Sequence, residues 1–256
     1  MTDFRKLSKL FFSGFFIILF LACNSQESKE QIYSGEALGT SYQIKFFYPE
    51  ELELQESLDS IFRNINESMS TYQDNSDISR INAGDTTIMV DENFRKVFMD
   101  SYQIYIKSRG FFDPTVGNLV NAYGFGPESG EAELDQEEVD SMLQYVGFNK
   151  LKLSNDNHII KDHPEIYLDF NAIAKGYTVD VLASYLESKG VEDILVEVGG
   201  ELVAKGKNLG KDFPWTVGID DPLQVEGKRS LTAALRLENR AMATSGNYRK
   251  FRVDSN

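Results

Sequence analysis

The sequence predicts an α+β fold of mixed sheets with packed helices. Short segments with alternating or continuous apolar residues, typical of strands, recur between residues 40 and 244. Between them lie longer segments whose apolar residues are three and four positions apart, as in amphipathic helices. The two kinds of element follow one another without the regular βαβ period of a parallel sheet, so the α+β class is favoured.

The first half of the chain is expected to hold one strand and three helices. Thr40–Tyr48 alternates and is rich in aromatic and β-branched residues, which indicates a strand. A helix is expected from Leu54, because apolar residues then recur at helical spacing. These residues are Leu58, Ile61, Phe62, Ile65 and Met69. Asp91 is expected to be the N-cap of a second helix that ends before Gly110. A third helix is expected at Gln136–Val146.

The second half is expected to be richer in strands. Short strands are predicted at Lys150–Leu153 and Glu165–Phe170, and a fourth helix at Ala172–Lys189, followed by Gly190 as its C′ residue. The remaining predicted strands are Asp193–Val198, a strand through Ala204, Trp215–Ile219, Leu231–Leu237 and Ala241–Thr244. The chain then ends soon after a segment typical of the beginning of a strand, so we expect the sequence to be truncated.

The N-terminus is typical of an export signal. Basic residues precede an apolar run, residues 10–22, that is shorter than the roughly 20 residues of a transmembrane helix. The run ends in Ala22-Cys23 and resembles the lipobox of bacterial lipoproteins, so Cys23 is expected to carry the lipid, palmitate included. An ordinary signal peptide or an uncleaved anchor is the alternative. We therefore expect a signal peptide at 1–22, a lipid-anchored tether at 23–31 and one domain at 32–256, exported and facing the periplasm from the cell membrane or the outer membrane.

Composition and missing motifs exclude several functions. The formal net charge is -14 at pH 7, which argues against nucleic-acid binding. The sequence has neither a G-x-G-x-x-G fingerprint nor a Walker A loop, so a Rossmann or P-loop nucleotide site is not expected. The two histidines, His158 and His163, lie near a predicted turn, where solvated loop residues are expected rather than a zinc site or a Ser-His-Asp triad.

Two segments carry more chemistry than a plain fold requires. In the first, adjacent Phe111 and Phe112 cannot both face one core, so one is free to stack on a flat ligand; a tight turn with a buried Phe pair is the alternative. The second, Leu168–Tyr177, runs from a predicted strand into a helix, where exposed N–H groups suit phosphate oxygens. Lys175 lies in the first helical turn, where a cation is disfavoured unless an anion is near. Asp169 suits a sugar or base, or alternatively caps the helix.

Several weak motifs occur in a fixed order and together resemble the ApbE family. They are Ala37-Leu38-Gly39-Thr40, Met69-Ser70-Thr71-Tyr72 with Ser79-Arg80-Ile81-Asn82, Phe112-Asp113-Pro114-Thr115-Val116-Gly117, Ala174-Lys175-Gly176-Tyr177 with Asp180, Val198-Gly199-Gly200, and Thr244-Ser245-Gly246-Asn247-Tyr248. The resemblance spans roughly Leu38 to Phe251, nearly the whole of the chain after Cys23.

The resemblance implies an activity, cofactors and partners. The family are FAD:protein FMN transferases that use FAD and Mg²⁺, attach FMN to a Thr or Ser of a target protein and release AMP. Subunits of the Na⁺-pumping NADH:quinone reductase and of the Rnf complex are the implied acceptors. An FAD-binding carrier lipoprotein, an FAD pyrophosphatase without transfer and a surface lipoprotein without flavin are the alternatives.

The resemblance also implies site residues. FAD contacts are implied at Leu38, Tyr72, Phe111, Phe112, Asp113, Asp169 and Lys175. Ala172 matches a Mg²⁺ ligand position, where an alanine would contribute only its backbone carbonyl. The family's catalytic histidine and main Mg²⁺ ligands lie in segments that have no counterpart before Asn256, so no catalytic residue is assigned and little transferase activity is expected of the sequence as it stands.

Overall fold

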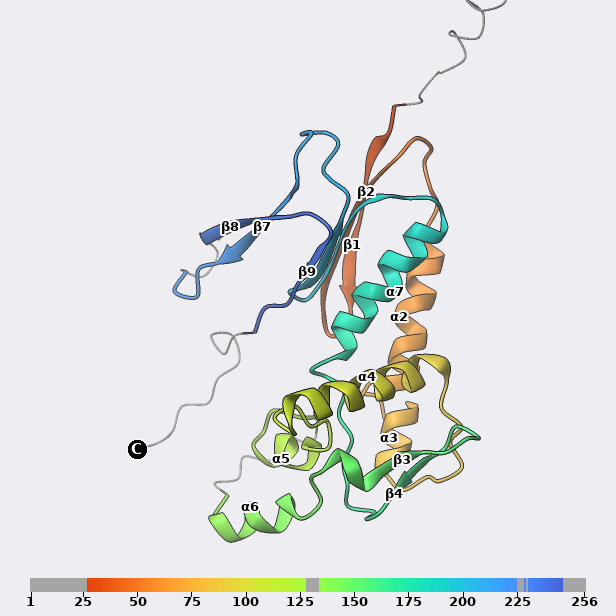
Figure 1. Cartoon of the computed structure of the whole chain (residues 1–256), viewed down its shortest axis with the longest axis vertical. Helices are drawn as coiled ribbons and strands as arrows, with labels where there is room; N and C mark the ends of the chain where they lie inside the picture. Colours follow the sequence, from red (N-terminus) through yellow and green to blue (C-terminus); the bar gives the residue numbers. More distant parts are fainter. Residues whose placement is uncertain (1–26, 128–133, 225–227, 229, 246–256) are drawn as a thin grey trace, which may run out of the picture.

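The computed structural model describes residues 27–127, 134–224, 228 and 230–245. Figure 1 shows an elongated molecule, with a sheet and two helices, α2 and α7, at one end and the helices α3 to α6 with a small hairpin at the other. Cys23, the predicted signal peptide and the last residues of the chain lie outside the described residues. Within those residues, no helix combines the length and apolarity that a membrane span requires.

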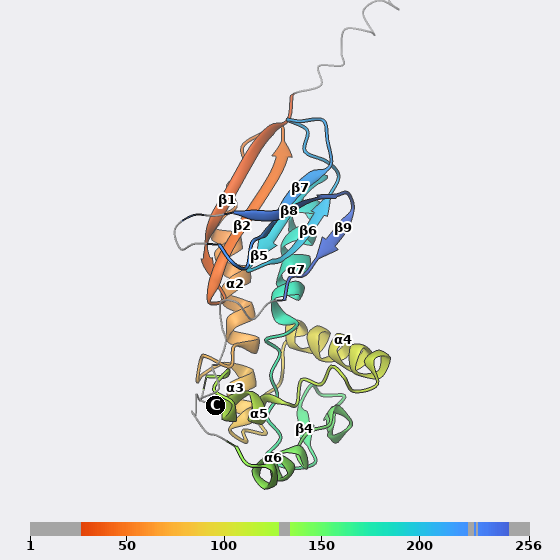
Figure 2. The ribbon, with the colours of Figure 1, turned by 90° about the vertical axis from the view of Figure 1, so that its left-hand side faces the viewer.

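The main sheet has five antiparallel strands in the order β1-β2-β5-β6-β9. The strands are β1 (Lys29–Ala37), β2 (Thr40–Tyr48), β5 (Asp193–Val198), β6 (Glu201–Lys205) and β9 (Arg240–Met242). Figure 2 shows the strands side by side, with β1 at one edge. The β1–β2 turn and the β5–β6 turn lie at the same end of the sheet, because β2 pairs with β5 from Tyr42↔Val198 onward.

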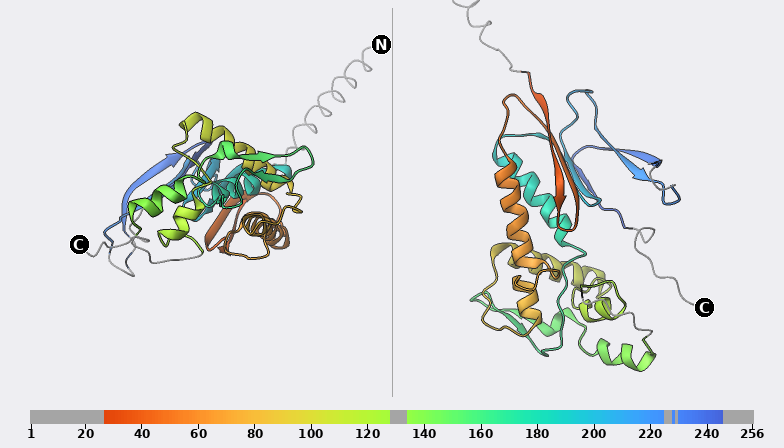
Figure 3. Two further views of the ribbon diagram at one scale, coloured as in Figure 1. Left: turned by 90° about the horizontal axis from the view of Figure 1, so that it is seen from below. Right: turned by 180° about the vertical axis from the view of Figure 1, so that it is seen from behind.

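Each face of the sheet is covered by a different layer. The helices α2 (Gln55–Met69) and α7 (Ala174–Ser188) pack on one face, where Ile44 and Phe46 of β2 are fully buried. The hairpin of β7 (Trp215–Asp220) and β8 (Leu231–Leu237) packs on the other face through Trp215. Figure 3 shows this arrangement from behind, with α2 and α7 on one side of the sheet and the hairpin on the other. The period-2 alternation of β2 places its aromatic residues in both layers.

A second core lies beyond the sheet. It contains α3 (Asp77–Asn82), α4 (Glu92–Ser108), the 3₁₀ turn η1 (Phe148–Lys150), β3 (Leu151–Leu153) and β4 (Ile159–Lys161), with α5 (Gly117–Ala122) and α6 (Gln136–Leu143) at its side. The helix α2 joins the two cores, since Leu58 and Phe62 are buried in the first and Ile65 and Met69 in the second. The junction between the two cores therefore receives the ends of α2 and of the sheet and the start of α7.

Several predicted elements are confirmed. The strands β2, β5 and β8 have the predicted bounds. Asp91 caps α4, because its carboxylate accepts a hydrogen bond from the Phe94 amide at 2.8 Å. The helix ends in left-handed backbone at Arg109 (φ 57°) and Gly110 (φ 83°).

Other predictions are wrong for identifiable reasons. β1 was not predicted and begins at Lys29, because an exposed edge strand lacks the apolar alternation that reveals a half-buried one. Glu165–Phe170 is not a strand and forms only one isolated parallel bridge, Val116↔Tyr167. The short elements α3, α5 and β4 were not predicted. The third predicted helix stops at Leu143, the fourth begins at Ala174 and the last strand lies at Arg240–Met242.

Candidate functional site

The first turn of α7 has no side-chain cap. Its N-cap residue is Ile173, and the amides of Ile173 and Ala174 turn back to the carbonyl of Phe170 at 2.9 and 2.8 Å. The amides of Lys175 and Gly176 donate to no acceptor within the described residues. A helix start with unpaired N–H groups carries a partial positive charge and suits an anionic oxygen.

Asp169 lies immediately before this helix start, but it is not the helix cap. Its carboxylate accepts hydrogen bonds from the Asn171 amide at 2.6 Å and from Asn171 Nδ2 at 3.1 Å, which is an Asx turn. Burial raises the pKa of Asp169, while the bonds from Asn171 and the charge of Lys175 oppose the shift. Asn171 Nδ2 also donates to Thr71 Oγ1 at 3.2 Å, which brings the end of α2, next to Tyr72, to the same place. The alternative of Asp169 as an N-cap is therefore wrong.

Lys175 lies over the turn between β5 and β6. A Cβ at Gly199 would lie 3.2 Å from Lys175 Cδ and 2.7 Å from Thr40 Cγ2, so only glycine allows this close approach, and its φ of 63° suits glycine too. Lys175 makes no salt bridge within the described residues. Its charge acts on two carboxylates, Asp169 and Glu201; burial raises the pKa of Glu201, and the charge of Lys175 opposes that shift. Glu201 Oε2 is buried and has no hydrogen-bond partner in the described part of the chain.

The loop that follows α4 presents one aromatic ring to solvent. Phe111 is 95% exposed, whereas Phe112 is half-buried, which agrees with the prediction that the two rings cannot share one core. Asp113 anchors the loop: its carboxylate accepts from the Thr115 amide at 2.9 Å, the Thr115 hydroxyl at 2.6 Å and the Phe148 amide at 3.2 Å. The Asp113 side chain is thus engaged with protein donors.

This loop packs directly against the Asp169 segment. The Asp169 amide donates to the Pro114 carbonyl at 2.8 Å. A Cβ at Gly117 would lie 2.4 Å from Tyr167 Cδ1 and 3.2 Å from Asp169 Cβ, so the two backbones could not approach as they do with any larger residue. The 111–117 loop and the segment of residues 167–173 that leads into α7 therefore form one continuous surface.

Leu38 and Tyr72 lie at the rim of this surface. Leu38 adopts left-handed backbone (φ 52°) in the β1–β2 turn and contacts both apolar cores. Tyr72 is 57% exposed just beyond α2. A groove of about 400 Å³ lies against α2, and Ala37, Arg63 and Gln73 are among its lining residues, but none of the residues predicted to contact FAD lines it. The hydrogen bonds and close contacts bring Asp169 and the 111–117 loop together. Tyr72 follows Thr71, which bonds Asn171. Leu38 lies two residues before Thr40, which flanks Gly199 together with Lys175.

Comparison with known proteins now decides the relationship. The ApbE family model matches residues 38–256. The chain belongs to the ApbE family. It is 34% identical to the FAD:protein FMN transferase of Haemophilus influenzae over 243 residues, which cover 90% of this chain and 70% of that protein. It is 35% identical to the FAD:protein FMN transferase of Vibrio cholerae, over 91% of this chain and 71% of that protein.

Solved structures of the ApbE family have the same fold. The flavin transferase ApbE from Vibrio cholerae superposes with a TM-score of 0.77 at 34% identity, covering 90% of this chain and 75% of that chain. The flavinyl transferase ApbE from Pseudomonas stutzeri, in its apo form, superposes with a TM-score of 0.75 at 28% identity, covering 89% and 74%. The predicted family and α+β class are thereby confirmed.

Ala172 is the one described residue that the ApbE resemblance links to Mg²⁺. It is exposed, and its carbonyl accepts no hydrogen bond from any described residue. A free carbonyl oxygen is the hard kind of ligand that Mg²⁺ takes, but Mg²⁺ prefers six oxygens. The described residues contain no group of three His, Cys, Asp or Glu able to hold a metal ion. Ala172 therefore fits as a single ligand, and a complete Mg²⁺ site would need further oxygens from elsewhere.

Three residues that support the candidate site were not assigned a role from the sequence. Asn171 connects Asp169 with Thr71, and the Asp-x-Asn spacing is a signal for an Asx turn that could have found it. Asn82 bonds the backbone of Leu168, although the two residues are far apart in the sequence. Lys161 bonds three backbone carbonyls, and no local pattern marks it.

Proposed function

We propose that this chain is an FAD:protein FMN transferase, which cleaves the pyrophosphate of FAD and attaches FMN to a Thr or Ser of a target protein, with release of AMP. The carrying observation is the uncapped start of α7, where unpaired amides and Lys175 lie beside the half-buried carboxylate of Asp169. The names of the relatives from Haemophilus influenzae and Vibrio cholerae support the same activity.

The described residues suit the parts of such a substrate. The free amides at Lys175 and Gly176 and the Lys175 ammonium would hold the pyrophosphate oxygens. The Asp169 carboxylate would accept hydrogen bonds from a sugar or base, and the exposed ring of Phe111 would stack on a flat ring. Asp113 would act through the loop backbone, because protein donors already engage its carboxylate.

The reaction would need mainly positioning and charge stabilisation. The acceptor hydroxyl oxygen forms a bond to the FMN phosphorus, the bond from that phosphorus to the bridging oxygen breaks, AMP departs and the hydroxyl proton is released. Mg²⁺, when bound, would neutralise the pyrophosphate and stabilise the charge on the leaving group, and the Ala172 carbonyl would be one of its ligands. Attack by water instead would make the chain an FAD pyrophosphatase.

The proposal includes a membrane address. Cys23 would carry the lipid anchor after removal of residues 1–22, and the exported domain would face the periplasm. A doubly acylated N-terminus anchors stably, whereas a single chain is marginal. β1 begins at Lys29, so only a short segment would separate the lipid from the sheet. Membrane complexes such as the Na⁺-pumping NADH:quinone reductase or Rnf would supply the acceptor subunits.

The experiment is a flavinylation assay. The complete gene product is mixed with FAD, Mg²⁺ and an acceptor domain, and the denatured acceptor is inspected for covalent flavin fluorescence in the gel. The proposal expects a fluorescent acceptor only when FAD and Mg²⁺ are both present. Binding of FAD without AMP release would favour a carrier, and failure of FAD to raise the melting temperature would contradict a flavin site altogether.

A further inference from the structure

The sequence predicts a strand at Glu165–Phe170, but side chains, rather than a neighbouring strand, bond the backbone just before Asp169. Lys161 Nζ donates to the carbonyls of Pro164 at 2.8 Å and Ile166 at 3.0 Å, and it lies 3.4 Å from the carbonyl of Asn82. Burial lowers the pKa of Lys161, against the opposing charge of Glu165. The partly buried Lys161 ammonium thus bonds three carbonyls that, in a sheet, would accept from the backbone amides of a neighbouring strand.

Asn82 bonds the backbone of Leu168, the residue immediately before Asp169. Its Oδ1 accepts from the Leu168 amide at 2.8 Å, and its Nδ2 donates to the Leu168 carbonyl at 2.8 Å. A side-chain amide therefore pairs with both backbone groups of Leu168, as a neighbouring strand would. The Leu168 side chain is fully buried, so the pair fixes a backbone whose side chain is already locked in the second core.

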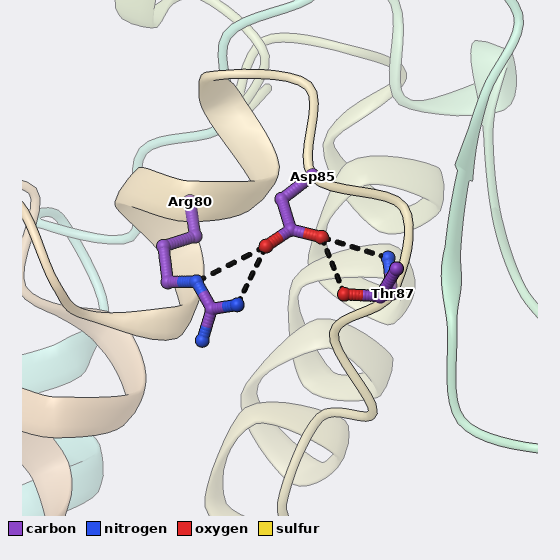
Figure 4. A network of polar contacts seen from close by, with 3 residues as sticks. All are labelled: Arg80, Asp85 and Thr87. Carbon is purple, nitrogen blue, oxygen red and sulfur yellow. Dashed lines mark hydrogen bonds and ion pairs between the residues drawn. The ribbon is translucent and has the colours of Figure 1, made fainter.

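The helix that carries Asn82 is itself fixed at both ends. At its start, the Ser76 and Ser79 hydroxyls donate to the Ser70 carbonyl at 2.7 and 3.2 Å, two residues before Tyr72. Just beyond its end, the Asp85 carboxylate bonds the Arg80 guanidinium, as Figure 4 shows. The same carboxylate accepts from the Thr87 amide and hydroxyl. Asn82 is therefore a rigid link between the end of α2 and the start of the Asp169 junction.

We propose that Asn82 and Lys161 are positioning residues of the flavin site, which set the backbone of residues 164–168 so that Asp169 and the first turn of α7 face the ligand. This inference rests on the proposed function. Neither residue is proposed to touch the substrate. They act through Leu168, and the Asp169 amide is held from the other side by the Pro114 carbonyl.

The test compares two asparagines. Asn82→Ala removes both bonds to Leu168. The control Asn93→Ala also removes two bonds, one of 2.9 Å from the Tyr177 hydroxyl across a similar sequence separation and one of 3.2 Å to the Asp91 carboxylate. FAD affinity is measured by flavin fluorescence titration, and stability by the melting temperature. We expect Asn82→Ala to weaken FAD binding by about tenfold or more, since small misplacement is costly, and Asn93→Ala to change it by less than about threefold. Equal effects of the two variants on FAD affinity would overturn the proposal.

Two further variants and a measurement of amide hydrogen exchange test the same proposal. Asn82→Asp preserves size and still accepts from the Leu168 amide, so it replaces Asn82→Ala if that variant does not fold; we expect FAD affinity below that of the wild type. Lys161→Met keeps the stem but loses the ammonium, and we expect weaker FAD binding again. Amide hydrogen exchange in ligand-free protein should quicken at Leu168 and Asp169 in each of these variants, but not in Asn93→Ala. Unchanged exchange at Leu168 and Asp169 would refute the positioning role, and this readout does not depend on FAD binding. Wild-type protein that binds no FAD would instead refute the proposed function.

Discussion

Replacing Asp169 should separate ligand binding from folding. In Asp169→Ala the fold loses two hydrogen bonds, from the Asn171 amide and from Asn171 Nδ2. Asn171 is exposed, so water can replace the lost acceptor, and the raised pKa of Asp169 shows that burying its charge already costs stability. We therefore expect a loss of about 1 kcal/mol or less in the free energy of unfolding. That corresponds to a fall of about 2–4 °C in melting temperature for a domain of this size.

The expected effect on the ligand is larger. A hydrogen bond to a charged carboxylate contributes about 1.5–3 kcal/mol. Its loss should weaken FAD binding by about 10- to 100-fold, since about 1.4 kcal/mol corresponds to a factor of ten. The assays are fluorescence titration with FAD and thermal unfolding without ligand. Asp162→Ala, which removes another acidic side chain near the same segment, is the control and should change neither quantity.

The reasoning about Asp169 would be refuted by a parallel loss. If stability and FAD affinity fall by the same free energy, the carboxylate serves only the Asx turn with Asn171. The raised pKa adds a second check. Lowering the pH through that pKa should protonate Asp169 and weaken FAD binding, and this step should be missing in Asp169→Asn.

Three further predictions concern other features of the chain. Phe111→Ala should leave the melting temperature unchanged, because the ring is 95% exposed, yet weaken FAD binding by about five- to tenfold through the loss of about 1 kcal/mol of stacking. Gly199→Ala should destabilise the fold in urea unfolding by about 1–3 kcal/mol, and by more than Gly84→Ala, because both glycines have positive φ but only Gly199 has atoms within 4 Å of the new Cβ. The pKa of Asp85 is lowered to about 2 by its bonds to Thr87 and Arg80, so its stabilising effect is present above the unfolded value of 3.8 and is lost as the pH falls towards about 2. The melting temperatures of wild type and Asp85→Asn should therefore converge over that pH range.

Each of these has a clear contrary result. A drop in melting temperature for Phe111→Ala would mean that the ring supports the fold. Equal losses in the free energy of unfolding for Gly199→Ala and Gly84→Ala would show that the close contacts of Gly199 do not require glycine. A stability difference for Asp85→Asn that stays constant from pH 5 to pH 2 would show that the carboxylate charge contributes nothing to the fold.

Much of the fold follows from local patterns because the apolar residues report which face is buried. β2 was predicted with its exact bounds, since its alternating aromatic residues contact both layers of the molecule. β1 escaped prediction because it is a polar edge strand whose backbone pairing with β2, rather than side-chain burial, holds it in place. Residues 165–170 look like a strand but are bonded by Lys161 and Asn82, which no local pattern reveals.

The candidate site was predictable in part for the same reason. The helix start with Lys175 in its first turn, and the pair Phe111-Phe112, carry their chemistry in adjacent residues. The link from Asn82 to Leu168 and the contact between Gly199 and Thr40 join segments that are distant in the sequence, so only the fold reveals them. None of the expected ligand contacts is tested by the fold, so all of them stay predictions: those of Leu38, Tyr72, Phe111, Phe112, Asp113, Asp169 and Lys175 with FAD, and that of Ala172 with Mg²⁺.

The central claim is that this chain transfers FMN from FAD to a protein hydroxyl. The most direct test incubates the complete gene product with FAD, Mg²⁺ and an acceptor domain and quantifies two products of the reaction: AMP in solution and flavin bound covalently to the acceptor. The account predicts equal amounts of both, and neither product when the acceptor threonine or serine is replaced. AMP without acceptor-bound flavin, or no AMP at all, would contradict it.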